Sequence, residues 1–181
     1  MESFDKFKIE LSLKARNGID FTLSATIIWG LVAYIWTLPI SSYNKSVLVF
    51  MVSSLLLPTA LGLSKLLKTK WKIEENPLQP LGLWLNFAQL FYFPFLIFTL
   101  VKMPDYFIMT YAIITGAHLF PYAWLYKTKW YAIFAGVIAV GALILALALP
   151  NEQMFFVALY TSFLLFVLTV GLYFDVKRRK R

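Results

Sequence analysis

Hydrophobic residues along the chain gather into six long runs separated by short polar connections. The runs cover about 19–39, 47–67, 81–101, 107–126, 130–149 and 154–174, and a run of about 20 apolar residues matches the hydrocarbon thickness of a bilayer, about 30 Å. They are apolar on all sides, which favours helices over the alternating strands of a transmembrane barrel. The pattern therefore predicts an all-α membrane protein with six transmembrane helices in one bundle, over residues 19–174.

The distribution of Lys and Arg predicts how this bundle is oriented. Fifteen of the 17 basic residues lie in the N-terminal segment, the connection between runs two and three, the connection between runs four and five, or the C-terminal segment; Lys45 and Lys102 are the other two. Short loops rich in Lys and Arg stay in the cytoplasm. Both termini are therefore predicted to be cytoplasmic.

The segments outside the runs carry their own patterns. In residues 1–18, Phe4, Phe7 and Leu11 recur at helical spacing among charged residues, which predicts a short amphipathic helix at the inner interface, ended by Gly18. An alternation of apolar residues between Phe7 and Leu13 is the competing strand pattern. Residues 175–181, "DVKRRKR", are predicted to form a basic cytoplasmic tail, a topology signal that also favours anionic lipids.

Composition and charge agree with a membrane protein and exclude several kinds of chemistry. Hydrophobic residues make up 60% of the chain and charged residues 14%, against about 45–50% and 25% in soluble domains. The net charge of +8 lies at the predicted inner boundary, so it favours the bilayer and not nucleic acid as the partner. With no cysteine and one histidine, the chain lacks the ligands for cysteine or clustered-histidine metal sites, and no cofactor is predicted.

Four polar side chains inside the third and fourth runs are the main candidates for a site, because such groups are costly at bilayer depth. Asn86 and Gln89 are three residues apart, and His118 and Tyr122 are four apart, so each pair shares one helix face. At about 1.5 Å of rise per residue, Gln89 and His118 both lie roughly 12 Å from the cytoplasmic boundary, and Asn86 and Tyr122 roughly 6–8 Å. The four groups are predicted to form one polar patch in the inner half of the bilayer.

Other residues would complete such a patch. Pro94 and Pro121 each free a backbone carbonyl one turn earlier, at Leu90 and Ala117, and are predicted to kink their helices beside it. Aromatic side chains would supply the apolar walls of the pocket, namely Trp84, Phe87, Tyr92 and Trp124.

Asp20, at the start of the first run, is the only carboxylate expected near the patch. An acid in the first turn of a helix also complements the helix dipole. Its role as a ligand-binding group and its role as a helix-capping charge both stay open.

The fifth run, by contrast, has no ionisable or amide side chain. Two rows of small residues at helical spacing let helix backbones approach closely: Ala132, Gly136 and Val140, and Ala135, Ala139, Ala142 and Ala146. This run is predicted to be a structural helix packed against its neighbours.

Two segments, "NPLQPLGLWLNFAQLFYFP" (76–94) and "YAIITGAHLFPYAWLYKTK" (111–129), resemble an uncharacterised family of small, mainly Gram-positive bacterial, six-helix integral membrane proteins, known only as a domain of unknown function. The resemblance covers nearly the whole chain, and residues 76–129 carry most of its specificity. It implies a bacterial inner-membrane protein and supplies no substrate, cofactor or catalytic residue.

Three functions are compatible with these features. The first is binding or transport of a small amphipathic or lipid-like ligand in an inner-leaflet pocket formed by the polar patch. The second is an intramembrane enzyme that uses His118 as general base, oriented by Asp20 or Tyr122. The third is a structural or accessory subunit, in which the patch is a hydrogen-bonded clamp between two helices.

Overall fold

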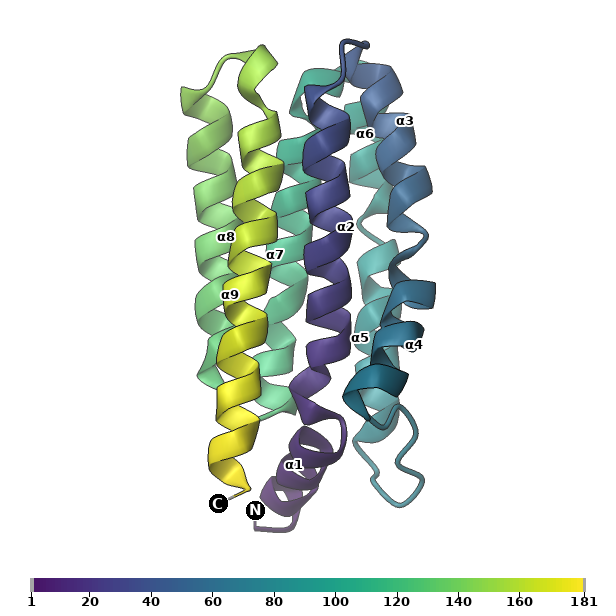
Figure 1. Ribbon diagram of the computed structural model, residues 1–181, viewed down its shortest axis with the longest axis vertical. Helices are drawn as coiled ribbons and strands as arrows, with labels where there is room; N and C mark the ends of the chain where they lie inside the picture. Colours follow the sequence, from purple (N-terminus) through teal and green to yellow (C-terminus); the bar gives the residue numbers. More distant parts are fainter. Residues whose placement is uncertain (1, 181) are drawn as a thin grey trace.

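The structure is a computed structural model, and it describes the backbone of residues 2–180 and the side chains of residues 4–180. Within that range it contains α-helices and short 3-10 turns and no strand. The helices run nearly side by side along the long axis of the molecule (Figure 1). The predicted all-α fold is confirmed, and so is the N-terminal helix, which excludes the competing strand pattern.

Each of the six predicted runs is helical. Their boundaries agree with the prediction to within a few residues, except that the second run starts earlier and the sixth ends later than predicted. In chain order the structure has α1 (Glu2–Lys14), α2 (Ile19–Thr37), α3 (Ser42–Ser53), α4 (Leu56–Leu67), α5 (Gln79–Leu90), α6 (Phe93–Lys102), α7 (Phe107–Leu125), α8 (Lys129–Ala148) and α9 (Phe155–Arg179). Three 3-10 turns lie between them, at Arg16–Gly18, Pro104–Tyr106 and Asn151–Gln153.

Five helical segments are long and apolar enough to cross a membrane, and they indicate a membrane protein. They are Arg16–Thr37, Ser42–Leu67, Gln79–Lys102, Lys129–Ala148 and Asn151–Arg179. The helix α7 is not among them, because His118, Pro121 and two tyrosines lower its hydropathy. It lies in the interior of the bundle, in contact with α8, α9, α5 and α6, where neighbouring helices shield polar side chains from lipid.

The second and third runs are each broken into two helices. The breaks lie between Ser53 and Leu56 and between Leu90 and Phe93, and both are followed within a few residues by a proline, Pro58 and Pro94. Proline removes one backbone donor and clashes with the carbonyl four residues earlier, so each helix restarts after a tight turn. The pieces α3 and α6 contact each other, whereas α4 packs on α2 and α5 packs on α7.

The core is formed by α2, α7, α8 and α9. Trp29 of α2 stacks on Tyr111 of α7 with ring centroids 4.8 Å apart. On the other side of α7, a Cβ on Gly116 would lie 2.9 Å from the Ala139 nitrogen and 3.0 Å from the Ala135 oxygen. The small-residue row of α8 is therefore packed against α7, and the predicted structural role of this helix agrees with the packing.

One end of the molecule, which we call the basic end, carries α1, the loop 68–78, the turn 126–128 and the C-terminal turns of α9 (Figure 1). Among its 15 predicted cytoplasmic Lys and Arg, all but Arg181 lie in the described part of the chain. Because α1 and the end of α9 lie at the same end, the chain runs from one end of the molecule to the other an even number of times.

Candidate functional site

Two of the predicted patch residues meet at one backbone carbonyl between α5 and α7. Asn86 Nδ2 donates to the Gly82 oxygen at 3.1 Å, within α5, and the Tyr122 hydroxyl donates to the same oxygen at 3.4 Å from α7. The two side chains are thus linked through the Gly82 carbonyl, one turn before Asn86 on α5. We call the region formed by Asn86, Gln89, His118, Tyr122 and the Gly82 carbonyl the α5–α7 seam.

His118 lies one turn further along α7 and touches Tyr122 edge to face, with ring centroids 5.3 Å apart and planes at 73°. Gln89 is three residues beyond Asn86 and His118 is four residues before Tyr122, so the two lie at similar depth. Both side chains are half-buried. Within residues 4–180, neither the His118 ring nor the Gln89 amide makes a hydrogen bond to another residue. The seam therefore holds two polar groups that are free to bind a ligand.

The predicted pocket walls are more exposed than a closed pocket would need. The Trp84 side chain is 68% exposed and packs edge to face on Phe87, and Tyr92 and Trp124 are also exposed. The Lys8 ammonium of α1 lies 3.6 Å from the centre of the Trp124 ring. These aromatics flank the seam as open apolar surface, because α5 contributes no fully buried residue to the bundle.

Asp20 lies in a different set of contacts. Its side chain is 1% exposed, and its Oδ2 accepts hydrogen bonds from the Thr69 hydroxyl at 2.7 Å and from Trp71 Nε1. Phe21 stacks on Trp71 with ring centroids 4.8 Å apart. Asp20 thus ties the loop 68–78 to the first turn of α2. The two residues proposed to orient His118, Asp20 and Tyr122, each direct their polar atoms to other partners.

A cluster of three tyrosines leads from the seam to the basic end. Tyr122, Tyr126 and Tyr131 pack on one another with ring centroids between 5.6 and 6.1 Å apart. The Tyr131 hydroxyl donates to the Asn17 backbone oxygen at 2.6 Å. The cluster therefore joins α7 and α8 to the turn between α1 and α2.

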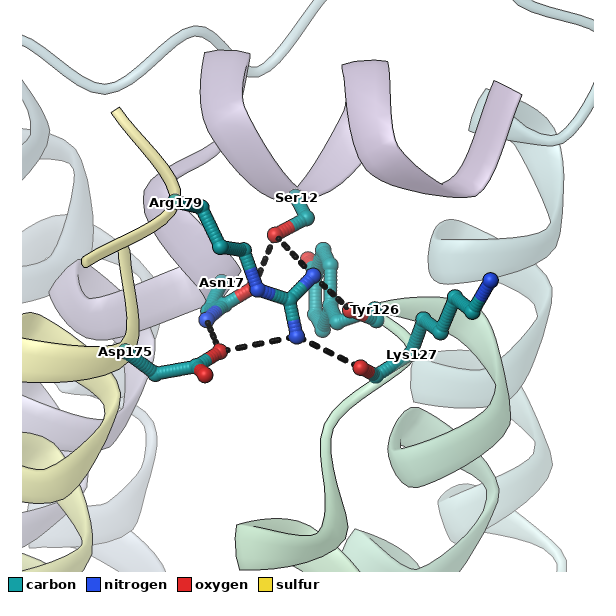
Figure 2. Close-up of polar contacts among 6 residues, drawn as sticks. All are labelled: Ser12, Asn17, Tyr126, Lys127, Asp175 and Arg179. Atoms are coloured by element: carbon teal, nitrogen blue, oxygen red, sulfur yellow. Dashed lines mark hydrogen bonds and ion pairs between the residues drawn. The ribbon is translucent and has the colours of Figure 1, made fainter. Parts of the chain in front are cut away.

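That turn is built around Asn17, a buried residue that the sequence pattern did not single out. Its φ is +55°, in the left-handed region that asparagine tolerates better than most residues, and Gly18 follows at +70°. The side chain accepts from the Ser12 hydroxyl at 2.6 Å and donates to Asp175 Oδ2 at 3.0 Å. One side chain thus joins α1, the turn and α9 (Figure 2).

Arg179 completes what we call the basic-end network: Ser12, Asn17, Asp175, Arg179 and the backbone of Tyr126 and Lys127. Its Nη1 donates to the Ser12 hydroxyl and to the Tyr126 oxygen, both at 3.1 Å, and its Nη2 contacts Asp175 at 2.9 Å and the Lys127 oxygen (Figure 2). Its side chain is 19% exposed. Residues 175–179 of the predicted basic tail (175–181) thus continue α9, with Asp175 and Arg179 in contact with other segments and Lys177 and Arg178 exposed.

The helix α1 is held at both edges of the basic end. Lys127 Nζ pairs with Asp5 at 2.8 Å, while Asn76 Nδ2 donates to the Phe7 oxygen at 2.8 Å and to Glu10 at 2.9 Å. The hydrogen bond from Lys127 lowers the pKa of Asp5, and hydrogen bonds from Lys14 and then Asn76 lower the pKa of Glu10. The helix thus lies across the basic end, between the loop 68–78 and the turn 126–128.

The residues of the basic-end network left only a weak signal in the sequence. Asp175 and Arg179 are spaced four apart, which suits a pair on one helix face, and Asn-Gly at 17–18 suits a backbone turn. Neither pattern identifies Ser12 or the carbonyls at 126 and 127 as partners. Within residues 2–180 no group of three His, Asp or Glu side chains forms a metal site.

The sequence was also compared with models of known families. The model of a family of unknown function, DUF7010, matches residues 4–175. The chain belongs to this family. Comparisons with curated proteins and with solved structures give no match. The DUF7010 match includes the whole α5–α7 seam, the tyrosine cluster and all of the basic-end network except Arg179.

Proposed function

We propose that this DUF7010 protein is a six-span protein of the bacterial cytoplasmic membrane, with both termini in the cytoplasm, and that it binds or transports a small amphipathic or lipid-like ligand at the α5–α7 seam. In this proposal α7 crosses the membrane in addition to the five apolar segments, shielded by its neighbours. The observation that carries the site is the pair of half-buried, unpartnered side chains, Gln89 and His118, in a region flanked by exposed apolar residues.

The charge distribution supports the orientation. The described Lys and Arg residues gather at the basic end, while Lys45 and Lys102 belong to the opposite end. Lys177 and Arg178 in the last turn of α9 are exposed, unlike Arg179. Such exposed cations favour the anionic inner leaflet by about 1 kcal/mol each.

The side chains at the seam suit a ligand that enters from the lipid. Gln89 offers a donor and an acceptor, and a neutral His118 ring offers one of each. Exposed apolar side chains on the same two helices, Phe87, Leu90, Phe120 and Trp124, suit an acyl or other hydrocarbon chain. A polar head and an apolar tail would thus find matching surfaces next to each other.

Photolabelling of the protein in nanodiscs tests this proposal. A single-chain acylglycerol with a diazirine in its chain is expected to label peptides 82–92 and 115–124 more strongly than the exposed faces of α3 and α8. His118→Gln and Tyr122→Phe are expected to lower that labelling. The matched control is Tyr160→Phe, which removes a hydroxyl that donates to a backbone oxygen, Val137, at 2.8 Å far from the seam.

The melting temperature in detergent separates binding from packing. Unchanged melting with reduced labelling supports a ligand site. A lowered melting temperature in His118→Gln and Asn86→Leu, with labelling spread evenly over the exposed helices, would show that the seam is a clamp between helices and would overturn the proposal.

A further inference from the structure

We infer that the ligand of the α5–α7 seam has an uncharged polar head, carrying hydroxyl or carbonyl groups, on a hydrocarbon chain. This inference rests on the proposed function, and it adds the chemical class of the ligand. It follows from which polar groups the seam presents and from where the charged side chains of the molecule lie.

The groups at the seam are all hydrogen-bonding and none is permanently charged. They are the Gln89 amide, the His118 ring, the Asn86 amide, the Tyr122 hydroxyl and the Gly82 oxygen. Asn86 and Tyr122 already use their donors on Gly82. The free capacity therefore lies at Gln89 and His118, which together can both donate to and accept from a hydroxyl or carbonyl group.

The cations of the described chain are displaced from the seam. Lys8 is the nearest that contacts α7, and it lies over the Trp124 ring, six residues or about 9 Å of helix rise from His118. Lys127 lies nine residues away, about 13 Å, and is paired with Asp5. The ammonium of Lys8 contacts Trp124 and that of Lys127 contacts Asp5, so an anionic head at this depth would lack a permanently charged partner of opposite sign.

A cationic head would be equally unmatched. Asp20, the one buried acid of α2, directs Oδ2 to Thr69 and Trp71 in the loop 68–78. Other acids at the basic end are paired with cations: Asp5 with Lys127, Glu10 with Lys14, Glu74 with Lys72 and Asp175 with Arg179. Removing an unpaired charge from water is strongly unfavourable, whereas a hydroxyl or carbonyl needs only the hydrogen bonds that Gln89 and His118 can supply.

Three photoprobes with the same diazirine chain and different heads test the inference: an acylglycerol, a phosphatidic acid and an alkyl ammonium. Each is added to the full-length protein in nanodiscs, and labelling of peptides 82–92 and 115–124 is counted relative to the exposed α3 peptide around Met51. The neutral probe is expected to label the seam at least about tenfold more than either charged probe, a ratio that corresponds to about 1.4 kcal/mol.

Two variants make the result specific. Gln89→Leu is expected to lower labelling by the neutral probe, and Gln89→Lys is expected to shift the seam toward the phosphatidic acid, because it adds the missing cation. Equal or stronger seam labelling of the unaltered protein by a charged probe would overturn the inference and leave the proposed function standing. Seam labelling no stronger than at Met51 with all three probes would overturn the proposed function itself.

Discussion

Asn17 donates a hydrogen bond from Nδ2 to Asp175 Oδ2, across 158 residues of the chain. The same amide group accepts from Ser12, and the Asn17 backbone oxygen accepts from Tyr131. One residue in a left-handed turn thus joins α1, α8 and α9 at the basic end. The network makes the N-terminal segment part of the folded bundle.

Substitutions at Asn17 should separate its backbone role from its side-chain role. Asn17→Gly keeps a residue that tolerates φ of +55° but removes the bonds to Ser12 and Asp175. Asn17→Ala removes the same bonds and adds the steric cost of the left-handed conformation, about 1–2 kcal/mol. We expect both variants to be destabilised and Asn17→Ala to be the less stable by about that amount, measured by denaturation in mixed micelles. Equal stability of the two variants would contradict the role of the left-handed turn.

Arg179 should tolerate no replacement, although it lies among exposed basic residues. Its guanidinium group contacts Ser12, Asp175 and two backbone oxygens, and the single ammonium of Lys cannot reproduce that geometry. Arg179→Met leaves Asp175 without its cation and should cost about 3–5 kcal/mol. Arg179→Lys should recover only part of this.

The neighbouring Arg178 provides the matched control, because it is exposed in the same helical turn. Arg178→Met and Arg178→Lys should change the free energy of unfolding by less than about 0.5 kcal/mol. A similar loss in the Arg178 and Arg179 variants would indicate that total basic charge, and not the network, stabilises this end.

Much of the fold follows from the local hydrophobic pattern. Three prolines inside the runs differ in their effect, and this difference could not be predicted from the pattern. Pro94 coincides with a break at Leu90–Phe93, as predicted, and Pro58 follows a similar break that was not predicted. Pro121, however, lies inside the continuous helix α7. The helix α7 is packed by several neighbours, whereas α5 and α4 are peripheral, so tertiary packing decides whether a proline ends a helix.

The candidate site was predictable only in part, for a related reason. Depth along two antiparallel helices predicts Asn86 and Tyr122 at one level, because helix rise is constant, and in the structure both side chains bond to the Gly82 oxygen. Apart from Asp175, which is four residues before Arg179, the partners of Asp20 and Arg179 lie 49 to 167 residues away in the chain, and no local spacing reveals them. The run "DVKRRKR" therefore indicates only a basic tail, and the contacts of Asp175 and Arg179 with other segments are seen in the structure alone.

Gly116 should be intolerant of even one added methyl group. A Cβ there would lie within about 3 Å of backbone atoms of α8, at Ala135 and Ala139, and backbone cannot move aside as a flexible side chain does. We expect Gly116→Ala to cost about 1–3 kcal/mol. Gly136→Ala is the control, because a Cβ at Gly136 meets nothing within 4 Å, and it should be neutral or up to about 1 kcal/mol more stable. Thermal unfolding of both variants in the same detergent distinguishes them.

Docking of α1 should weaken in acid. The pKa of Asp5 is lowered by the hydrogen bond from Lys127, and the pKa of Glu10 by the bond from Lys14 within α1 and then by the bond from Asn76. The bonds from Lys127 and Asn76 exist only when α1 is docked. A carboxyl group with a lowered folded-state pKa stabilises the fold above its unfolded-state pKa, and this contribution is lost as the pH falls through the folded-state value. We therefore expect α1 to loosen below about pH 4.

A spin label at Leu11→Cys measures this directly, since the chain has no other cysteine and Leu11 is buried against the bundle. Label mobility should rise between about pH 5 and pH 3 while α-helical content, read by circular dichroism, stays constant. In Asp5→Asn combined with Glu10→Gln, mobility should already be raised at neutral pH and should change little on acidification. The same acid-induced rise in this double variant would mean that other carboxyl groups control the position of α1, with Asp175 beside Arg179 as the first to examine.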